Sequence, residues 1–92
     1  MKVSILDVQK KIYDGVADEV TLPVFDGEVT VMDDHEPVYF VLSRGWIRLR
    51  SSVEQMGVRT QGAGQDFQRS RRIAIHSGLA RMKRNELVVL VE

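Results

Sequence analysis

Residues 18–32, with the sequence DEVTLPVFDGEVTVM, decide the fold of this chain. Apolar and polar residues alternate in two short runs, one on each side of the Asp26–Gly27 pair. The apolar residues at alternate positions share one face of each run. These are Val20 and Leu22 in the first run, and Val29 and Val31 in the second. A period of two is typical of half-buried β-strands, and an Asp-Gly pair between two such runs predicts a β-hairpin.

The same alternation recurs along the rest of the chain. It is clear in residues 45–51 (GWIRLRS) and 71–77 (RRIAIHS). Residues 37–43 (PVYFVLS) and 86–92 (ELVVLVE) are apolar on both faces, which predicts central strands that are covered on each side. Turn-forming residues separate the runs at Gly15, Pro23, Asp26–Gly27, Pro37, Gly45, Gly78 and Asn85.

The number and spacing of these runs predict an all-β fold, a flattened antiparallel β-sandwich or barrel of about eight to ten short strands. The length of 92 residues predicts one domain, residues 1–92. Residues 51–72 break the alternation, because they are polar and rich in Gly and Gln, and they predict a long flexible hairpin with a mobile tip. Val53, Val58 and Phe67 are expected to extend its strands.

The composition excludes several classes of protein. The chain has no cysteine, which excludes disulfides, thiolate catalysis and cysteine-based zinc sites. The longest apolar runs, VYFVL and LVVLV, are far too short to span a bilayer, and the first residues do not form a signal peptide. These features predict a soluble protein with no direct membrane insertion.

The net charge of zero hides an asymmetry between the two halves of the chain. Residues 1–46 carry four Lys/Arg and nine Asp/Glu, a net charge of −5, whereas residues 47–92 carry nine and four, a net charge of +5. Such a chain is poorly suited to hold nucleic acid by electrostatics alone. It is better suited to docking between an acidic and a basic surface.

The sequence DDHE at residues 33–36 is the main candidate for chemistry. Carboxylates beside a histidine can hold a metal ion or form an acid–base pair. In an extended segment, however, neighbouring side chains alternate sides, and the only other histidine is His76. A solvated, charged turn is the favoured interpretation, and the sequence predicts no catalytic, metal or cofactor site.

A resemblance to a known family rests on three stretches in this order: MKVSILDVQKKIYDGVADEVTLP (residues 1–23), DGEVTVMDDHEPVYFVLSRGWIRLR (26–50) and IAIHSGLARMKRNELVVLVE (73–92). Together they resemble the epsilon subunit of F-type ATP synthases, in its N-terminal β-sandwich domain. The resemblance implies a flattened sandwich of about ten strands. It also implies a non-catalytic rotor subunit of the central stalk, which links the gamma shaft to the membrane c-ring and couples ion translocation to ATP synthesis or hydrolysis. Such a subunit belongs to a hetero-oligomer at the cytoplasmic face of the membrane and needs no cofactor.

The resemblance also implies roles for particular residues. The loop and turn that face the c-ring in that family match, in this chain, Asp26, Glu28, Asp33, Asp34 and His35. The candidates for the gamma side are Val38, Phe40, Leu42, Arg44, Trp46 and Arg48. The apolar side chains among them fit either the core or an apolar contact, and the arginines are expected to pair with acids on gamma.

Two of this chain's departures from the family pattern bear directly on function. Asp33 and Asp34 stand where the family has Pro-Gly, so the turn is more acidic. The family's two inhibitory C-terminal helices have no counterpart in the 92 residues. A complete chain of this length predicts a subunit without that inhibition, whereas in a longer protein the helices would follow the sandwich; the sequence leaves both alternatives open. The alternative function is a free-standing β-sandwich module that binds RNA or a small ligand, suggested by the basic region 59–84.

Overall fold

The computed structural model describes residues 1–52 and 68–92, and every regular element in them is a β-strand. Within these residues there are nine strands: β1 (Lys2–Leu6), β2 (Lys11–Val16), β3 (Glu19–Val24), β4 (Gly27–Met32), β5 (Val38–Leu42), β6 (Gly45–Ser52), β7 (Gln68–Ile75), β8 (Gly78–Lys83) and β9 (Glu86–Val91). The predicted all-β class is confirmed. The predicted 51–72 hairpin falls largely on residues 53–67, outside the described part of the chain, and β6 and β7 pair on either side of it up to Ser52 and Gln68.

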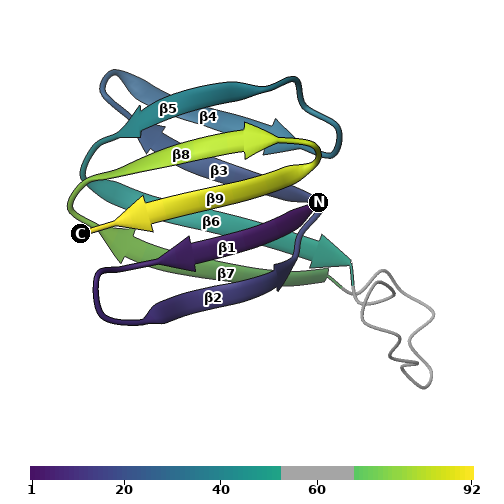
Figure 1. Ribbon diagram of the computed structural model, residues 1–92, viewed down its shortest axis with the longest axis horizontal. Helices are drawn as coiled ribbons and strands as arrows, with labels where there is room; N and C mark the ends of the chain where they lie inside the picture. The colour runs from purple at the N-terminus through teal and green to yellow at the C-terminus, as the bar shows by residue number, and fades with distance from the viewer. Residues whose placement is uncertain (53–67) are drawn as a thin grey trace.

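The strands form two sheets that pack face to face as a sandwich (Figure 1). One sheet has five strands in the order β2-β1-β9-β8-β5, and the other has four in the order β4-β3-β6-β7. One pairing differs from the predicted antiparallel arrangement. Strands β1 and β9 run parallel, with Lys2 opposite Glu86 and Leu6 opposite Leu90. The short turn after β8 brings β9 back between β8 and β1, in the direction that β1 already takes.

The predicted hairpin around Asp26–Gly27 is present as β3 and β4. Val24 pairs with Gly27, so Phe25 and Asp26 form the turn, and Gly27 has a φ of 151° that other residues rarely adopt. Pro23 lies inside β3 and does not separate two runs. Strand β6 pairs with β3 only over Glu19–Thr21, so the missing N–H of Pro23 breaks no ladder hydrogen bond to β6.

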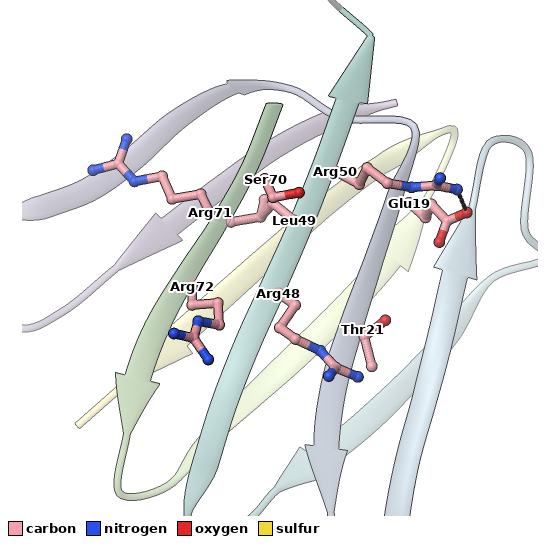
Figure 2. A pocket seen from close by; sticks show the side chains of 8 residues that line it. All are labelled: Glu19, Thr21, Arg48, Leu49, Arg50, Ser70, Arg71 and Arg72. Carbon is pink, nitrogen blue, oxygen red and sulfur yellow. Dashed lines mark hydrogen bonds and ion pairs between the residues drawn. The ribbon is translucent and has the colours of Figure 1, made fainter. Parts of the chain in front are cut away.

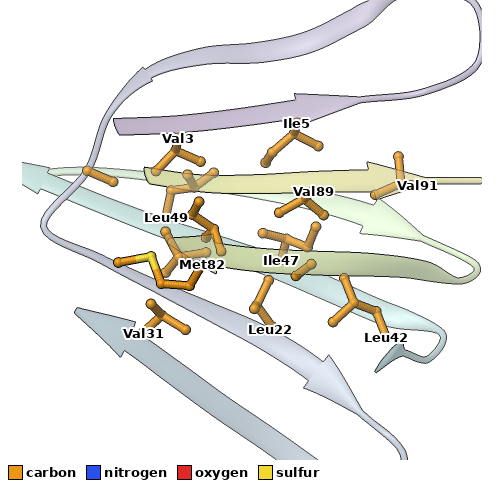
Figure 3. Packing of buried hydrophobic residues seen from close by; sticks show 14 of the residues in the cluster. Val3, Ile5, Leu22, Val31, Leu42, Ile47, Leu49, Met82, Val89 and Val91 are labelled. Carbon is orange, nitrogen blue, oxygen red and sulfur yellow. The ribbon is translucent and has the colours of Figure 1, made fainter. Parts of the chain in front are cut away.

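The core lies between the sheets and consists of the alternating apolar residues that point inward from both (Figure 3). Its largest fully buried side chains are Val3, Ile5, Val20, Leu22, Val31, Ile47, Met82, Leu87 and Val89. Each such side chain contributes about 1.5–3 kcal/mol by leaving water. The period of two in the sequence therefore becomes the inward face of each sheet.

Two predictions about individual strands are corrected by the strand order. Residues 37–43 were expected to form a central strand, but β5 is an edge strand that pairs only with β8 in the described residues. Gly15 was expected to separate two runs, but it lies inside β2 opposite Val3. Residues 86–92 do form a central strand, since β9 lies between β1 and β8.

The sandwich has two ends, which are named here by one residue each. The Met1 end holds the turn after β4 and the β8–β9 turn, because Lys2 pairs with Glu86 and Ala17 donates its N–H to the Met1 carbonyl over 3.0 Å. The Phe25 end holds the β1–β2 turn, the β3–β4 turn and Glu92 (Figure 1). Strand β4, six residues long, separates the ends by about 20 Å.

Candidate partner-binding surfaces

Four acidic residues and one histidine were predicted to share the end that faces the c-ring. In the structure they are divided between the two ends of the sandwich. Asp26 and Glu28 stand at the Phe25 end, where β4 begins. Asp33, Asp34 and His35 follow the last residue of β4 at the Met1 end. They are close in sequence, but the strand between them is extended, and extension carries the chain across the whole molecule. The structure therefore corrects the single group to two.

The side chains at the Met1 end are tied to their own fold. The terminal ammonium group of Met1 forms an ion pair with Asp33 and donates a hydrogen bond of 2.9 Å to the Ala17 carbonyl. The Asp34 amide, at a residue with φ of 62°, donates to Oδ1 of Asn85 over 2.7 Å. The Asp34–Asn85 bond joins the turn after β4 to the β8–β9 turn, and the Met1–Asp33 pair joins the turn after β4 to the start of the chain. In residues 1–52 and 68–92, no three His, Cys, Asp or Glu side chains come close enough to hold a metal ion.

The Phe25 end presents apolar side chains at two turn tips. Phe25, beside Asp26, is 93% exposed, and Val8, in the β1–β2 turn, is 90% exposed. Glu28, the other acid of the predicted group near this end, forms an ion pair with Arg48 at 2.8 Å. The two turns lie at opposite edges of this end (Figure 1), so Phe25 and Val8 are separate exposed apolar side chains, and each favours a role as an anchor for a partner.

The residues expected on the gamma side point in several directions. Leu42 is a core residue, and Val38 and Phe40 are partly buried and pack against the core. Trp46 and Arg48 lie on the outer face of the four-stranded sheet, where the Arg72 guanidinium covers the Trp46 ring at 5.1 Å from its centroid. Arg44 lies in the connection between β5 and β6. The six residues therefore do not form one surface.

An exposed apolar row that the site predictions missed crosses the outer face of the five-stranded sheet. Val41 on β5 lies opposite Leu79 on β8, and Leu79 lies opposite Leu90 on β9. These three side chains are 75%, 43% and 51% exposed, and Tyr39, two residues before Val41, is 69% exposed. This surface, made of Tyr39, Val41, Leu79 and Leu90, is called the β5–β8–β9 face below.

The sequence carries a signal for the β5–β8–β9 face. The runs VYFVL and ELVVLVE are apolar on both faces, which predicted covering layers on both sides. In the structure one side packs on the core, and within the described residues nothing covers the other side. A strand that is apolar on a face open to water is typical of a docking surface for a partner. The part of the chain that the structure describes holds no helix that could span a membrane.

Comparison with known proteins gives a consistent result at the level of the family. The family model of the ATP synthase delta/epsilon chain, β-sandwich domain, matches residues 1–92. The ATP synthase epsilon chain of Synechococcus sp. (strain PCC 6716) is 29% identical over 91 residues, covering 99% of this chain and 55% of that protein. The chloroplastic epsilon chain of Chlamydomonas reinhardtii is 29% identical over 90 residues, covering 98% of this chain and 57% of that protein. The chain thus spans about half the length of the curated relatives it matches.

Solved structures show the same fold at lower sequence identity. A chain in the central stalk and c-ring of the Tetrahymena thermophila mitochondrial ATP synthase superposes with a TM-score of 0.67 at 16% identity, covering 99% of this chain and 62% of that chain. A chain of the Euglena gracilis mitochondrial ATP synthase gives a TM-score of 0.71 at 14% identity, with coverages of 97% and 48%. At these identities the likeness concerns the fold.

Proposed function

The chain belongs to the family of ATP synthase delta/epsilon chains, in their β-sandwich domain, and on this premise we propose that it is a non-catalytic central-stalk subunit of an F-type ATP synthase. In this role it links the gamma shaft to the membrane c-ring and couples ion translocation to ATP synthesis or hydrolysis. It is a peripheral part of the complex at the cytoplasmic face of the membrane. The observation that carries the proposal is the family match over the whole chain, together with exposed apolar side chains on the β5–β8–β9 face and at the Phe25 end.

The β5–β8–β9 face is the proposed contact for gamma. Its side chains lie in register across three neighbouring strands, so they form one continuous apolar strip on a stiff sheet. Burial of this strip against a partner gains free energy in proportion to the apolar area removed from water. Val41 is the most exposed of the four, at 75%, and it lies on the edge strand. We therefore expect Val41 to contribute strongly to the contact.

The Phe25 end is the proposed contact for the c-ring. It carries exposed Phe25 and Val8 on two turns, with Asp26 beside Phe25. An apolar anchor flanked by a charge suits a polar loop of a partner, because the charge steers the encounter and the anchor supplies burial. Asp33, Asp34 and His35 lie at the other end, about 20 Å away along β4, and are left out of this contact.

Coupling needs a stiff link between these two surfaces. The β5–β8–β9 face and the Phe25 end belong to one sandwich, whose two sheets share a single cluster of buried side chains. Close-packed interiors have low compressibility and transmit strain. A torque applied by gamma at the face is therefore passed to the turns at the Phe25 end without a hinge in the described part of the chain.

The proposal is tested by co-purification with gamma. We expect V41D and L79D to lower gamma binding strongly, because each places a charge in an apolar contact. V16D is the matched control, since Val16 is 48% exposed and lies on β2, at the other edge of the same sheet. Wild-type binding in all three variants, or capture of RNA in place of gamma in a salt-sensitive way, would contradict the proposal.

A further inference from the structure

Three arginines gather on the outer face of the four-stranded sheet, the sheet opposite the one that carries the β5–β8–β9 face (Figure 2). Arg48 and Arg50 are on β6, and Arg72 is on β7. They border a hollow of about 410 Å³ that is lined by Glu19, Thr21, Arg48, Leu49, Arg50, Ser70, Arg71 and Arg72. The surface made by Arg48, Arg50 and Arg72 is called the arginine face below.

The arginine face holds like charges in direct opposition. Arg48 and Arg72 are register partners on neighbouring strands, and like charges at such positions are destabilising. The two guanidinium groups turn apart: Arg48 reaches Glu28 at 2.8 Å, and Arg72 lies over the Trp46 ring. In the described residues no carboxylate pairs with Arg72. An anion placed between Arg48 and Arg72 would relieve the repulsion.

The groups of the arginine face remain accessible to a ligand. The side chains of Arg48 and Arg50 are 49% and 45% exposed although each has an acidic neighbour. Thr21, whose hydroxyl shares a 3.1 Å hydrogen bond with that of Thr30, lies opposite Arg48 on β3, and Ser70 lies opposite Arg50 on β7. Hydroxyl groups beside guanidinium groups add hydrogen-bond donors for an anion's oxygen atoms.

We propose that the arginine face binds an acidic segment of another polypeptide in an extended conformation, with carboxylates at alternate positions. Arg50 lies two residues from Arg48 on the same strand, a spacing of about 7 Å. Alternate side chains of an extended peptide have the same spacing, so one carboxylate meets the Arg48–Arg72 pair and the next meets Arg50. Guanidinium groups bind carboxylates through paired, charge-assisted hydrogen bonds.

The features of the face favour a peptide over a nucleic acid. Glu19 and Glu28 lie on the same face and interrupt its positive charge, so the face lacks the continuous basic surface by which proteins hold a phosphate backbone. The Arg72 guanidinium already occupies one face of the Trp46 ring, so a base that stacked on that face would have to displace it. The face lies on the opposite sheet from the β5–β8–β9 face, so both can be occupied at once.

Binding can be followed through Trp46, the only tryptophan of the chain, because its ring contacts Arg72. The full chain is titrated with a short synthetic peptide of alternating glutamate and threonine, and with the same peptide carrying glutamine for glutamate. We expect a saturable change in Trp46 fluorescence with the glutamate peptide and no such change with the glutamine peptide. Binding of the glutamate peptide should weaken as the salt concentration is raised.

The double variant R48Q/R72Q is expected to weaken binding about tenfold, as the loss of two exposed charge contacts implies. The matched control R81Q/K83Q removes the same charge from exposed positions on β8 of the other sheet and is expected to bind as wild type. Circular dichroism checks that each variant is folded. The variant R72E, which reverses the charge, is expected to lose the glutamate peptide and to gain affinity for a lysine counterpart.

Three results would overturn the proposal. The first is an R48Q/R72Q variant that binds the glutamate peptide as tightly as the R81Q/K83Q control. The second is the absence of saturable binding by the wild-type chain. The third is tighter binding of a single-stranded RNA that R48Q/R72Q abolishes, which would assign the face to nucleic acid. None of these results depends on gamma or the c-ring, so this inference and the proposed function fail separately.

Discussion

The Nη2 atom of Arg48 lies 2.8 Å from the Oε1 atom of Glu28, although β6 and β4 are separated in the sheet by β3. The sequence placed these residues on two different partner surfaces, Glu28 toward the c-ring and Arg48 toward gamma. In the structure they satisfy each other across the outer face of one sheet. The acid that looked like a docking charge therefore already has a partner within the fold.

The Arg48–Glu28 pair is expected to contribute little to stability. Both side chains are about half exposed, at 49% and 51%, so water screens their attraction. We expect R48Q and E28Q each to change the free energy of unfolding by about 1 kcal/mol or less, and a double-mutant cycle to give a coupling below about 1 kcal/mol. Urea denaturation of the wild type, R48Q, E28Q and the double variant measures this coupling. A coupling of several kcal/mol would show that the pair supports the sheet.

Leu42 and Val41 are neighbours that should behave in opposite ways. Leu42 is buried at 3% exposure, and L42A is expected to cost about 2–5 kcal/mol of unfolding free energy by leaving a cavity. Val41 points outward at 75% exposure, and V41A should leave the free energy of unfolding within about 0.5 kcal/mol of wild type while it weakens gamma binding. Thermal unfolding and co-purification separate the two effects. Equal loss of stability in both variants would refute the assignment of Val41 to the surface.

Phe25 is expected to act in coupling without supporting the fold. Because its side chain is 93% exposed, F25S should change the free energy of unfolding by no more than about 0.5 kcal/mol. In assembled complexes we expect F25S to lower ion pumping driven by ATP hydrolysis while gamma binding persists. The control M32S removes an exposed apolar side chain from the other end of β4 and should pump as wild type. Unchanged pumping by F25S would exclude this turn from the c-ring contact.

Gly78 occupies a position where the backbone of the next strand leaves no room. A Cβ atom at Gly78 would lie 2.5 Å from the carbonyl oxygen of Leu90, which the β-ladder holds in place. We expect G78A to cost about 1–3 kcal/mol of unfolding free energy. The control G15A meets only the end of the Tyr13 side chain at 3.0 Å, which can move, and should cost less than about 1 kcal/mol. Equal costs would contradict the steric explanation.

Asp14 gives the fold a dependence on acid pH. The hydrogen bond from Lys11 Nζ to Oδ2 at 3.1 Å, with the positive charge of Lys11, holds the pKa of Asp14 below its ordinary value. A lowered pKa in the folded state stabilises the fold above the pKa of the unfolded chain, and this stabilisation is lost as the pH falls through the folded pKa. K11M should raise the pKa of Asp14, measured by NMR titration, whereas K10M should leave it unchanged. An unaltered pKa in K11M would disprove this cause.

Local features of the sequence were enough to predict the class of the fold. Alternating residues predicted β3, β4, β6 and β7, and the Asp26–Gly27 pair predicted the β3–β4 hairpin. These predictions succeed because the direction of a side chain in a strand and the geometry of a short turn depend on residues that are adjacent in sequence. The order of three motifs then predicted the family, and the family model confirms it over residues 1–92.

The surfaces could not be predicted in the same way, because strand order and sheet membership depend on contacts between residues far apart in sequence. Only the tertiary structure makes β5 an edge, sets β1 parallel to β9, and leaves Val41, Leu79 and Leu90 as one uncovered row. It also separates Asp26 from His35 by the length of β4 and brings Arg48 to Glu28. The sequence by itself thus determined which residues form strands and which side chains of a strand share one face. The packing of two sheets determined which faces meet each other and which face a partner, because burial depends on all the strands together.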